Sequence, residues 1–278
     1  MRLGAPVFED CSTPEAWVQA PQRKGYSAAF CPPVDPADDD AVRAYARAAE
    51  DADIIIGEVG AWSNPISPDE DERREAMAKC CAQLDLADRI GASCCVNISG
   101  ARGEKWDGPY AENLSAETFD MIVQSVREII DAVQPTRTYY SLETMPWVPP
   151  HSVQSYVDLI EAIDREQFGV HLDPVNLINC PERYFDTTSL LVECFERLGP
   201  WIHSCHAKDT LIETTLTVHL NEAVPGEGAL DWATYLRELS RLGPDVCLLI
   251  EHLGSEELYD SAAAHIRSVA DAEGLSFI

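Results

Sequence analysis

Short β-rich runs alternate with longer helical patterns along this chain, and this rhythm restricts the possible folds more than any other sequence feature. The β-rich runs lie at residues 3–8, 26–31, 53–59, 93–99, 138–144, 168–173, 201–207 and 246–252. The helical patterns lie at residues 41–51, 70–90, 116–133, 153–163, 188–198, 232–242 and 255–271. Only the first connection, around residues 14–21, has a short and irregular pattern. Strands that alternate with helices predict a parallel sheet covered by helices.

Such a sheet either stays open or closes into a barrel. The GxGxxG motif of open, dinucleotide-binding sheets is missing after the first β-rich run. Eight strand–helix repeats within 278 residues fit the usual length of a (β/α)8 TIM barrel, about 250 residues. The sequence therefore predicts an α/β fold in which residues 1–278 form a single (β/α)8 barrel domain.

The formal net charge of −28 restricts the partners of the chain. Nucleic acids and anionic membranes both attract clustered Lys and Arg, so neither is expected as a partner. No stretch approaches the roughly 20 apolar residues of a membrane span, and residues 1–10 lack the features of a signal peptide. We therefore expect a cytoplasmic protein that binds a small molecule.

Ten cysteines occur without any CxxC pair. Several of them, including Cys94, Cys95, Cys205 and Cys247, lie within apolar, strand-like runs. This placement favours reduced, buried cysteines over a disulfide framework.

Four consecutive β-rich runs end in side chains that can bind a metal ion: Glu143, Asp173, His206 and Glu251. The active site of a parallel barrel lies at the C-terminal ends of its strands, so these side chains are expected to meet at the barrel mouth. Three carboxylates there would repel one another without a cation. Oxygen ligands with one imidazole suit Mn²⁺, Mg²⁺, Co²⁺ or Zn²⁺, so we predict one divalent metal ion.

Other side chains are expected near the same mouth. Lys208 has the strand parity of His206, so it either takes part in catalysis or forms a salt bridge with Asp173 or Asp209. Trp62 and Trp147 follow strand ends and are predicted to pack against a substrate.

The sequence also predicts where three further histidines lie. His171, two residues before the metal-type Asp173, is expected one layer deeper in the barrel. His203 has the opposite parity to His206 and is expected to face the helices. His219 lies in the long loop after the seventh run, where a solvated side chain is expected.

The motifs resemble the xylose-isomerase-like barrel superfamily, which includes tagatose and psicose 3-epimerases, inosose dehydratases and an endonuclease IV branch. The resemblance covers almost the whole chain and depends on Ser141-Leu142-Glu143, His171-Leu172-Asp173, His206-Ala207-Lys208-Asp209, Pro225-Gly226-Glu227-Gly228 and Glu251. It implies that Glu143, Asp173, His206 and Glu251 bind one divalent ion, often manganese. It also implies a homo-dimer or homo-tetramer.

Three positions depart from the ketohexose epimerases of this superfamily. Asn176 stands where those enzymes carry His, Pro149 where they carry Glu, and Ile212 where they carry Arg. A ketohexose, the substrate of those epimerases, is therefore not the expected substrate of this chain. Asn176 is still expected to contact a substrate, and a small carbohydrate remains the expected substrate class.

The predicted function is a metal-dependent isomerase or epimerase that acts on a sugar or polyol by proton transfer through a metal-held enediolate. Glu143 and Glu251 are the expected bases, and Lys208 is the expected oxyanion partner or acid. The alternative is a lyase that dehydrates an inosose-like or keto-sugar substrate. Two other possibilities are less favoured: the histidine-rich metal cluster of DNA-repair hydrolases is missing, and a non-catalytic barrel would not need both candidate bases.

Overall fold

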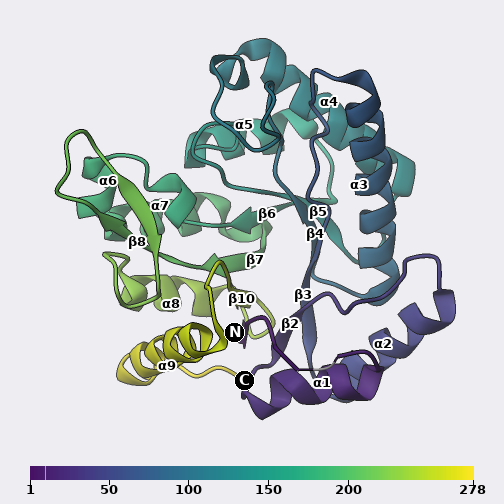
Figure 1. The fold of residues 1–278 in the computed structure, drawn as a ribbon, viewed down its shortest axis with the longest axis vertical. Helices are drawn as coiled ribbons and strands as arrows, with labels where there is room; N and C mark the ends of the chain where they lie inside the picture. The colour runs from purple at the N-terminus through teal and green to yellow at the C-terminus, as the bar shows by residue number, and fades with distance from the viewer. Residues whose placement is uncertain (10) are drawn as a thin grey trace.

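Eight parallel strands form the centre of the computed structural model, which describes residues 1–9 and 11–278 (Figure 1). Neighbouring strands follow the order β1-β10-β7-β6-β5-β4-β3-β2. The two end strands are also close, because Ser27 N donates to Leu3 O at 3.1 Å. The strands are β1 Arg2–Gly4, β2 Ala28–Phe30, β3 Ile55–Gly60, β4 Cys94–Asn97, β5 Tyr139–Glu143, β6 Phe168–Leu172, β7 Ile202–Ala207 and β10 Cys247–Ile250. The predicted (β/α)8 barrel is confirmed.

Helices surround this sheet (Figure 1). Their apolar side chains are buried against it. Leu84, Ile129, Leu159, Leu236 and Ile266, each from a different helix, are fully buried there. The helices are α1 Pro14–Arg23, α2 Asp39–Asp51, α3 Glu70–Ile90, α4 Ala116–Val133, α5 Val153–Ile163, α6 Pro181–Phe185, α7 Thr187–Leu198, α8 Trp232–Arg241 and α9 Glu256–Ala272. Short 3-10 turns lie at Ala111–Leu114, Val175–Leu177 and Gly199–Trp201.

The first connection is a regular helix, so the prediction of an irregular segment there was wrong. Thr13 caps α1 by accepting from Ala16 N, and Pro14 occupies the first turn, where no backbone N–H is needed. Pro21 lies near the other end of the helix, and Trp17 on the inner face is buried. The prolines thus mark the ends of this helix rather than disrupt it.

An antiparallel hairpin, β8 Asp209–Ile212 and β9 Leu220–Ala223, follows β7 and projects from the barrel at the left of Figure 1. The sequence predicted only a long loop here. Thr210 pairs with Glu222, which directs β9 back towards the barrel. His219 is exposed on the hairpin, as expected of a solvated histidine.

His203 does not face the helices, contrary to the parity prediction. The β6–β7 register shifts so that Val170 pairs with Ile202 and His171 with Ser204, which leaves His203 without a partner residue. Its ring stacks on Tyr139 with 3.5 Å between ring centroids. It also lies over Gly169, where a Cβ would be 2.4 Å from the ring. One extra residue in a strand reverses the alternation on which the prediction depended.

Candidate metal centre

The four predicted ligand residues meet at the C-terminal edge of four neighbouring strands. Glu143 ends β5, Asp173 directly follows β6, His206 lies near the end of β7, and Glu251 directly follows β10. Because these strands are adjacent in the order β10-β7-β6-β5, their ends bring the side chains together. Ligand atoms of all four residues lie within 4.8 Å of one another. We call these residues the quartet.

Local contacts fix the carboxylate of Asp173. Its Oδ1 accepts the backbone N–H of Val175 at 3.0 Å, in the 3-10 turn after β6. Thr144 holds the main chain on both sides, because its Oγ1 donates to Asp173 O and accepts from Asp173 N. The second carboxylate oxygen, Oδ2, is left facing the other members of the quartet.

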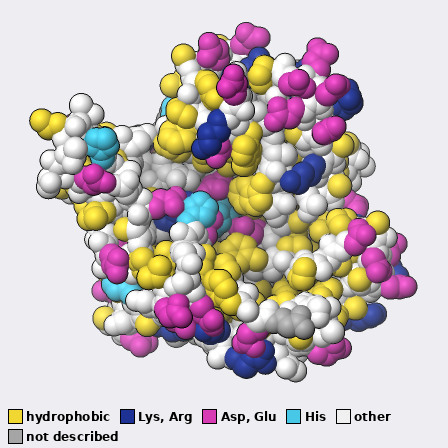
Figure 2. Space-filling model, in the orientation of Figure 1, with side chains coloured by type: hydrophobic (Ala, Val, Ile, Leu, Met, Phe, Trp, Pro, Cys, Tyr) yellow, Lys and Arg dark blue, Asp and Glu magenta, His cyan; other side chains and the backbone are white. Residues whose placement is uncertain are grey.

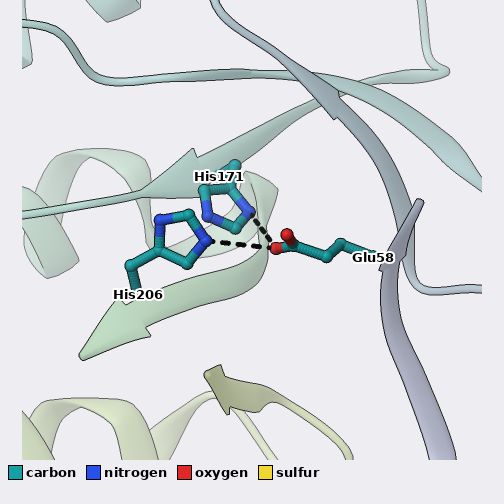
Figure 3. Close-up of side chains that lie close together, drawn as sticks. All are labelled: Glu58, His171 and His206. Carbon is teal, nitrogen blue, oxygen red and sulfur yellow. Dashed lines mark ion pairs between the residues drawn. The ribbon is translucent and has the colours of Figure 1, made fainter. Parts of the chain in front are cut away.

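His206 lies between carboxylates on both sides of its ring. Nδ1 is 2.8 Å from Glu251 Oε1 and 3.2 Å from Glu143 Oε1. Nε2 is 3.3 Å from Oε2 of Glu58, a buried side chain on β3 (Figure 3). A carboxylate on the far side of a metal-binding histidine favours a proton there and leaves the near nitrogen for the metal. Glu58 therefore favours Nδ1 as the nitrogen available to a cation.

Glu58 was not among the predicted site residues. Its sequence signal is an acidic side chain within an apolar, strand-like run, Ile54 to Val59, but it does not end that run. His171 lies beside it, with Nδ1 at 3.6 Å from Glu58 Oε2 and its ring 4.1 Å from that of His206 (Figure 3). Burial lowers the pKa of His171 well below its ordinary value, so this ring is neutral. Its expected position, one layer deeper than Asp173, is confirmed.

Lys208 faces the mouth, as its parity predicted. Its Nζ lies 2.6 Å from Asp173 Oδ2, 2.6 Å from Glu251 Oε1 and 3.8 Å from Glu143 Oε1. The salt bridge to Asp173 is therefore present, whereas Asp209 is engaged elsewhere. Burial opposes the charge of Lys208, but the surrounding carboxylates outweigh it and raise its pKa well above the ordinary value.

Asp209 orders the segment that carries the Pro-Gly-Glu-Gly motif. Its carboxylate accepts the backbone N–H groups of Gly226 and Leu230 and the indole N–H of Trp232, each at 2.9 Å. Gly226 has a φ of +95°, and a Cβ on Gly228 would lie 2.2 Å from Asp209 Oδ1. Both glycines are therefore required by this turn rather than by the metal-binding geometry.

The quartet fits a divalent cation. Asp173 Oδ2 and Glu251 Oε1 are buried and accept no hydrogen bond of normal geometry from the described residues, despite the nearby ammonium of Lys208. Burial raises the pKa of Asp173 to about 7 against the effect of Lys208, and the neighbouring carboxylates add to the rise. For His206, burial lowers the pKa, but Glu251, Glu143 and Glu58 outweigh burial and raise it well above its ordinary value. A site that concentrates negative charge on oxygen ligands and one imidazole suits Mn²⁺, Mg²⁺, Co²⁺ or Zn²⁺.

A cavity of about 510 Å³ opens above the quartet. The predicted substrate contacts Trp62, Trp147, Asn176 and Lys208 all line it. Asn176 Nδ2 donates to Glu143 Oε1 at 3.1 Å, and Trp147 is held by its indole N–H, which donates to Asp107 O. Figure 2 shows this face hollowed near its centre, with acidic side chains and a histidine in the hollow and hydrophobic side chains around it.

Two further cavity residues, Glu222 and His252, were not predicted. Glu222 reaches the cavity from β9 and lies 3.2 Å from Lys208 Nζ and 3.0 Å from His252 Nδ1. His252 follows Glu251 with a φ of +59°. Glu222 raises the pKa of His252. Glu222 carries no signal in the sequence, because the hairpin that positions it is not apparent there. His252 ends the run 246–252 with a strand parity opposite to that of Glu251, and the sequence does not indicate its left-handed backbone conformation.

These features define an α/β barrel with a candidate metal site, and comparison with known proteins agrees on the barrel. The model of the xylose isomerase-like TIM barrel family matches residues 18–269. The chain belongs to this family. No curated protein sequence matches it.

Solved structures share the fold at low sequence identity. A probable 3-DHS dehydratase from Bacillus anthracis is 17% identical with a TM-score of 0.70, over 96% of this chain and 98% of that one. D-psicose 3-epimerase from Clostridium cellulolyticum H10 is 16% identical with a TM-score of 0.68, over 99% and 98%. A xylose isomerase-like TIM barrel protein from Mycobacterium smegmatis, in complex with magnesium, is 16% identical with a TM-score of 0.67, over 94% and 90%.

Among the helices of the described residues, none combines the length and apolarity needed to cross a membrane.

Proposed function

We propose that this protein is a divalent-metal-dependent isomerase or epimerase that acts on a sugar or a related polyol. The observation that carries the proposal is the convergence of the quartet, within 4.8 Å, at the base of a cavity with tryptophan walls. The likeness to a D-psicose 3-epimerase and to a magnesium-bound barrel supports it. Manganese is the metal we favour.

The quartet would hold the metal, which when bound would polarise a carbonyl and an adjacent hydroxyl of the substrate. Glu143 and Glu251 flank His206 and line the cavity, so we assign them the removal and return of the proton beside that carbonyl. Bases that act on opposite faces of the substrate carbon give epimerisation. Because Asn176 donates to Glu143, it also orients one of the two bases.

The remaining cavity residues bind and shield the substrate. The ammonium of Lys208 is placed to donate a hydrogen bond to a substrate oxyanion beside Glu251. Trp62 and Trp147 offer flat apolar surfaces against which the C–H faces of a sugar ring pack.

A dehydratase is the second candidate, and the position of Lys208 favours it. A buried ammonium next to a candidate base can protonate a hydroxyl as it leaves, while Glu251 removes the proton. One of the similar structures is a probable 3-DHS dehydratase. Mass spectrometry separates the two reactions, because dehydration gives a product lighter by one water and epimerisation leaves the mass unchanged.

Metal binding tests the centre first. We expect the wild type to bind about one equivalent of Mn²⁺ and to gain thermal stability from it, and Glu143→Gln to lose most of both because one anionic ligand is removed. Glu161→Gln, an exposed change on α5, is the matched control and should behave as the wild type. A wild type that neither binds nor responds to Mn²⁺, Mg²⁺, Co²⁺ or Zn²⁺ would overturn the proposal.

Proton transfer tests the reaction. Ketoses and inososes incubated with the Mn²⁺-loaded protein in D₂O should gain deuterium beside the carbonyl, seen by NMR, if Glu143 and Glu251 exchange that proton. Glu251→Gln should reduce this exchange by at least about 100-fold. Metal binding without exchange or dehydration of any of these substrates would contradict the assigned substrate class.

A further inference from the structure

A second hollow of about 490 Å³ adjoins the cavity above the quartet. It lies among the segments that follow β1, β2 and β10, with α1 and α9 beside it. Phe30, Glu251 and His252 line both hollows. Since Glu251 belongs to the quartet, this second hollow, which we call the apolar groove, begins at the candidate metal centre itself.

The groove is built from apolar side chains. Buried Trp17, Ala29 and Tyr259 form its inner part, while Val7 and Pro33 are more exposed. Hydrophobic side chains also border the central hollow on the face drawn in Figure 2. A contiguous apolar hollow that opens to solvent marks a binding site more often than a packing defect.

The charges of the groove exclude an anionic ligand. Among the described residues that line it there is no lysine or arginine. Nearby cations are already paired, Arg23 with Glu9, Lys208 with Glu251 and His252 with Glu222, so a phosphate or carboxylate placed there would find no free cation among the described residues. The groove therefore suits an uncharged, apolar group.

A single sugar does not need this second space. The cavity above the quartet alone has a volume in the range that encloses a drug-sized ligand, and it already contains the candidate bases and the two tryptophans. A ligand held at the quartet could fill the groove only through a substituent that passes Glu251 and His252.

We propose that the substrate is a polyol or keto-sugar bearing an apolar, ring-sized substituent, and that this ring lies in the apolar groove while the sugar oxygens face the quartet. The inference rests on the proposed function and names its substrate class. A free monosaccharide or a sugar phosphate would leave the groove unused.

Matched pairs of glycosides test the groove. Methyl and phenyl β-D-glucoside, β-D-galactoside and β-D-xyloside are titrated calorimetrically into the Mn²⁺-saturated protein. In at least one pair we expect the phenyl member to bind about 10-fold more tightly or better, because its ring is removed from water.

Two groove variants and one control locate the ring. Val7→Asp adds a carboxylate to the groove, and Cys31→Phe fills part of it, so each should reduce the phenyl preference to less than about twofold. Val218→Asp adds the same charge on the hairpin, outside the groove, and should keep the preference. If one groove variant does not fold, the other still tests whether the phenyl ring lies in the apolar groove.

Each remaining outcome counts against a defined claim. Equal affinities within every pair, or a phenyl preference that survives both groove variants, overturn the groove assignment. Binding of Mn²⁺ without binding of any glycoside overturns the substrate class and leaves the metal centre intact. Failure of the proposed metal-dependent function gives a different result from these two outcomes. In that case either Mn²⁺ does not bind, or the methyl glycosides bind equally well with and without Mn²⁺.

Discussion

At the scale of single residues, Glu58 favours Nδ1 as the nitrogen of His206 that is available to a cation. Its carboxylate lies 3.3 Å from Nε2, while Nδ1 points to Glu143 and Glu251. Glu58→Gln removes the charge that favours a proton on Nε2. We expect this change to weaken Mn²⁺ binding about 10- to 100-fold, measured by calorimetry, although Glu58 is not itself one of the quartet.

The matched control for this prediction is Glu75→Gln, an exposed change on α3, which should leave the Mn²⁺ affinity unchanged. An affinity of Glu58→Gln within about twofold of the wild type would mean that the ring of His206 is held by its packing alone.

The quartet could be predicted from sequence because each of its members ends an apolar run, and parallel strands bring their ends to one edge. Glu58 was missed because it lies before the end of β3 and contacts His206 across the barrel. Glu222 could not be placed because its position depends on the pairing of Thr210 with Glu222, which no local pattern indicates. Side chains at the end of their own strand are therefore predictable, whereas those that lie deeper in the barrel or on another element are not.

At the scale of elements, Asp209, the first residue of β8, connects the start of the hairpin to the segment that precedes α8. Four N–H groups, from Thr210, Gly226, Leu230 and Trp232, point at one buried carboxylate. Asp209→Asn would replace one acceptor oxygen with an NH₂ group that faces a donor. We expect a loss of about 2–4 kcal/mol in the free energy of unfolding, measured by urea denaturation.

The control for Asp209→Asn is Asp271→Asn, an exposed position near the end of α9, where the expected loss is under about 0.5 kcal/mol. Equal stability of the two variants would show that the turn does not depend on this carboxylate. In the sequence, the Pro-Gly-Glu-Gly motif indicates only a family resemblance. Its physical basis, close approach of Gly228 to Asp209, required the fold.

Elements were predictable where a local pattern and the tertiary packing agreed. The strands and the long helices satisfy that condition, and the structure confirms them. The first connection does not, because its prolines suggest irregularity while their positions at the two ends of α1 permit a helix. The register shift beside His203 is likewise set by the contact with β6 rather than by the sequence of β7.

At the scale of the whole molecule, 48 acidic residues against 20 Lys and Arg make self-repulsion a general feature of the surface. Most described ion pairs have at least one exposed side chain, and pairs open to solvent stabilise little, so they do not offset this repulsion. Salt screens repulsion between surface charges, because the Debye length falls from about 10 Å at 0.1 M to about 3 Å at 1 M. The folded state, which holds like charges closer together than the unfolded chain, should gain from that screening.

We therefore expect the melting temperature to rise by roughly 3–6 °C between 0.05 M and 0.5 M NaCl, with the Mn²⁺ concentration held constant. Screening approaches completion within this range, so the rise should level off, and KCl and NaCl should give the same curve because only ionic strength matters. A rise that continues linearly to 2 M, or that differs between the two salts, would point to salt exclusion from the surface or to specific cation binding. A melting temperature that falls with salt would show that attraction, not repulsion, dominates among the charges of this molecule.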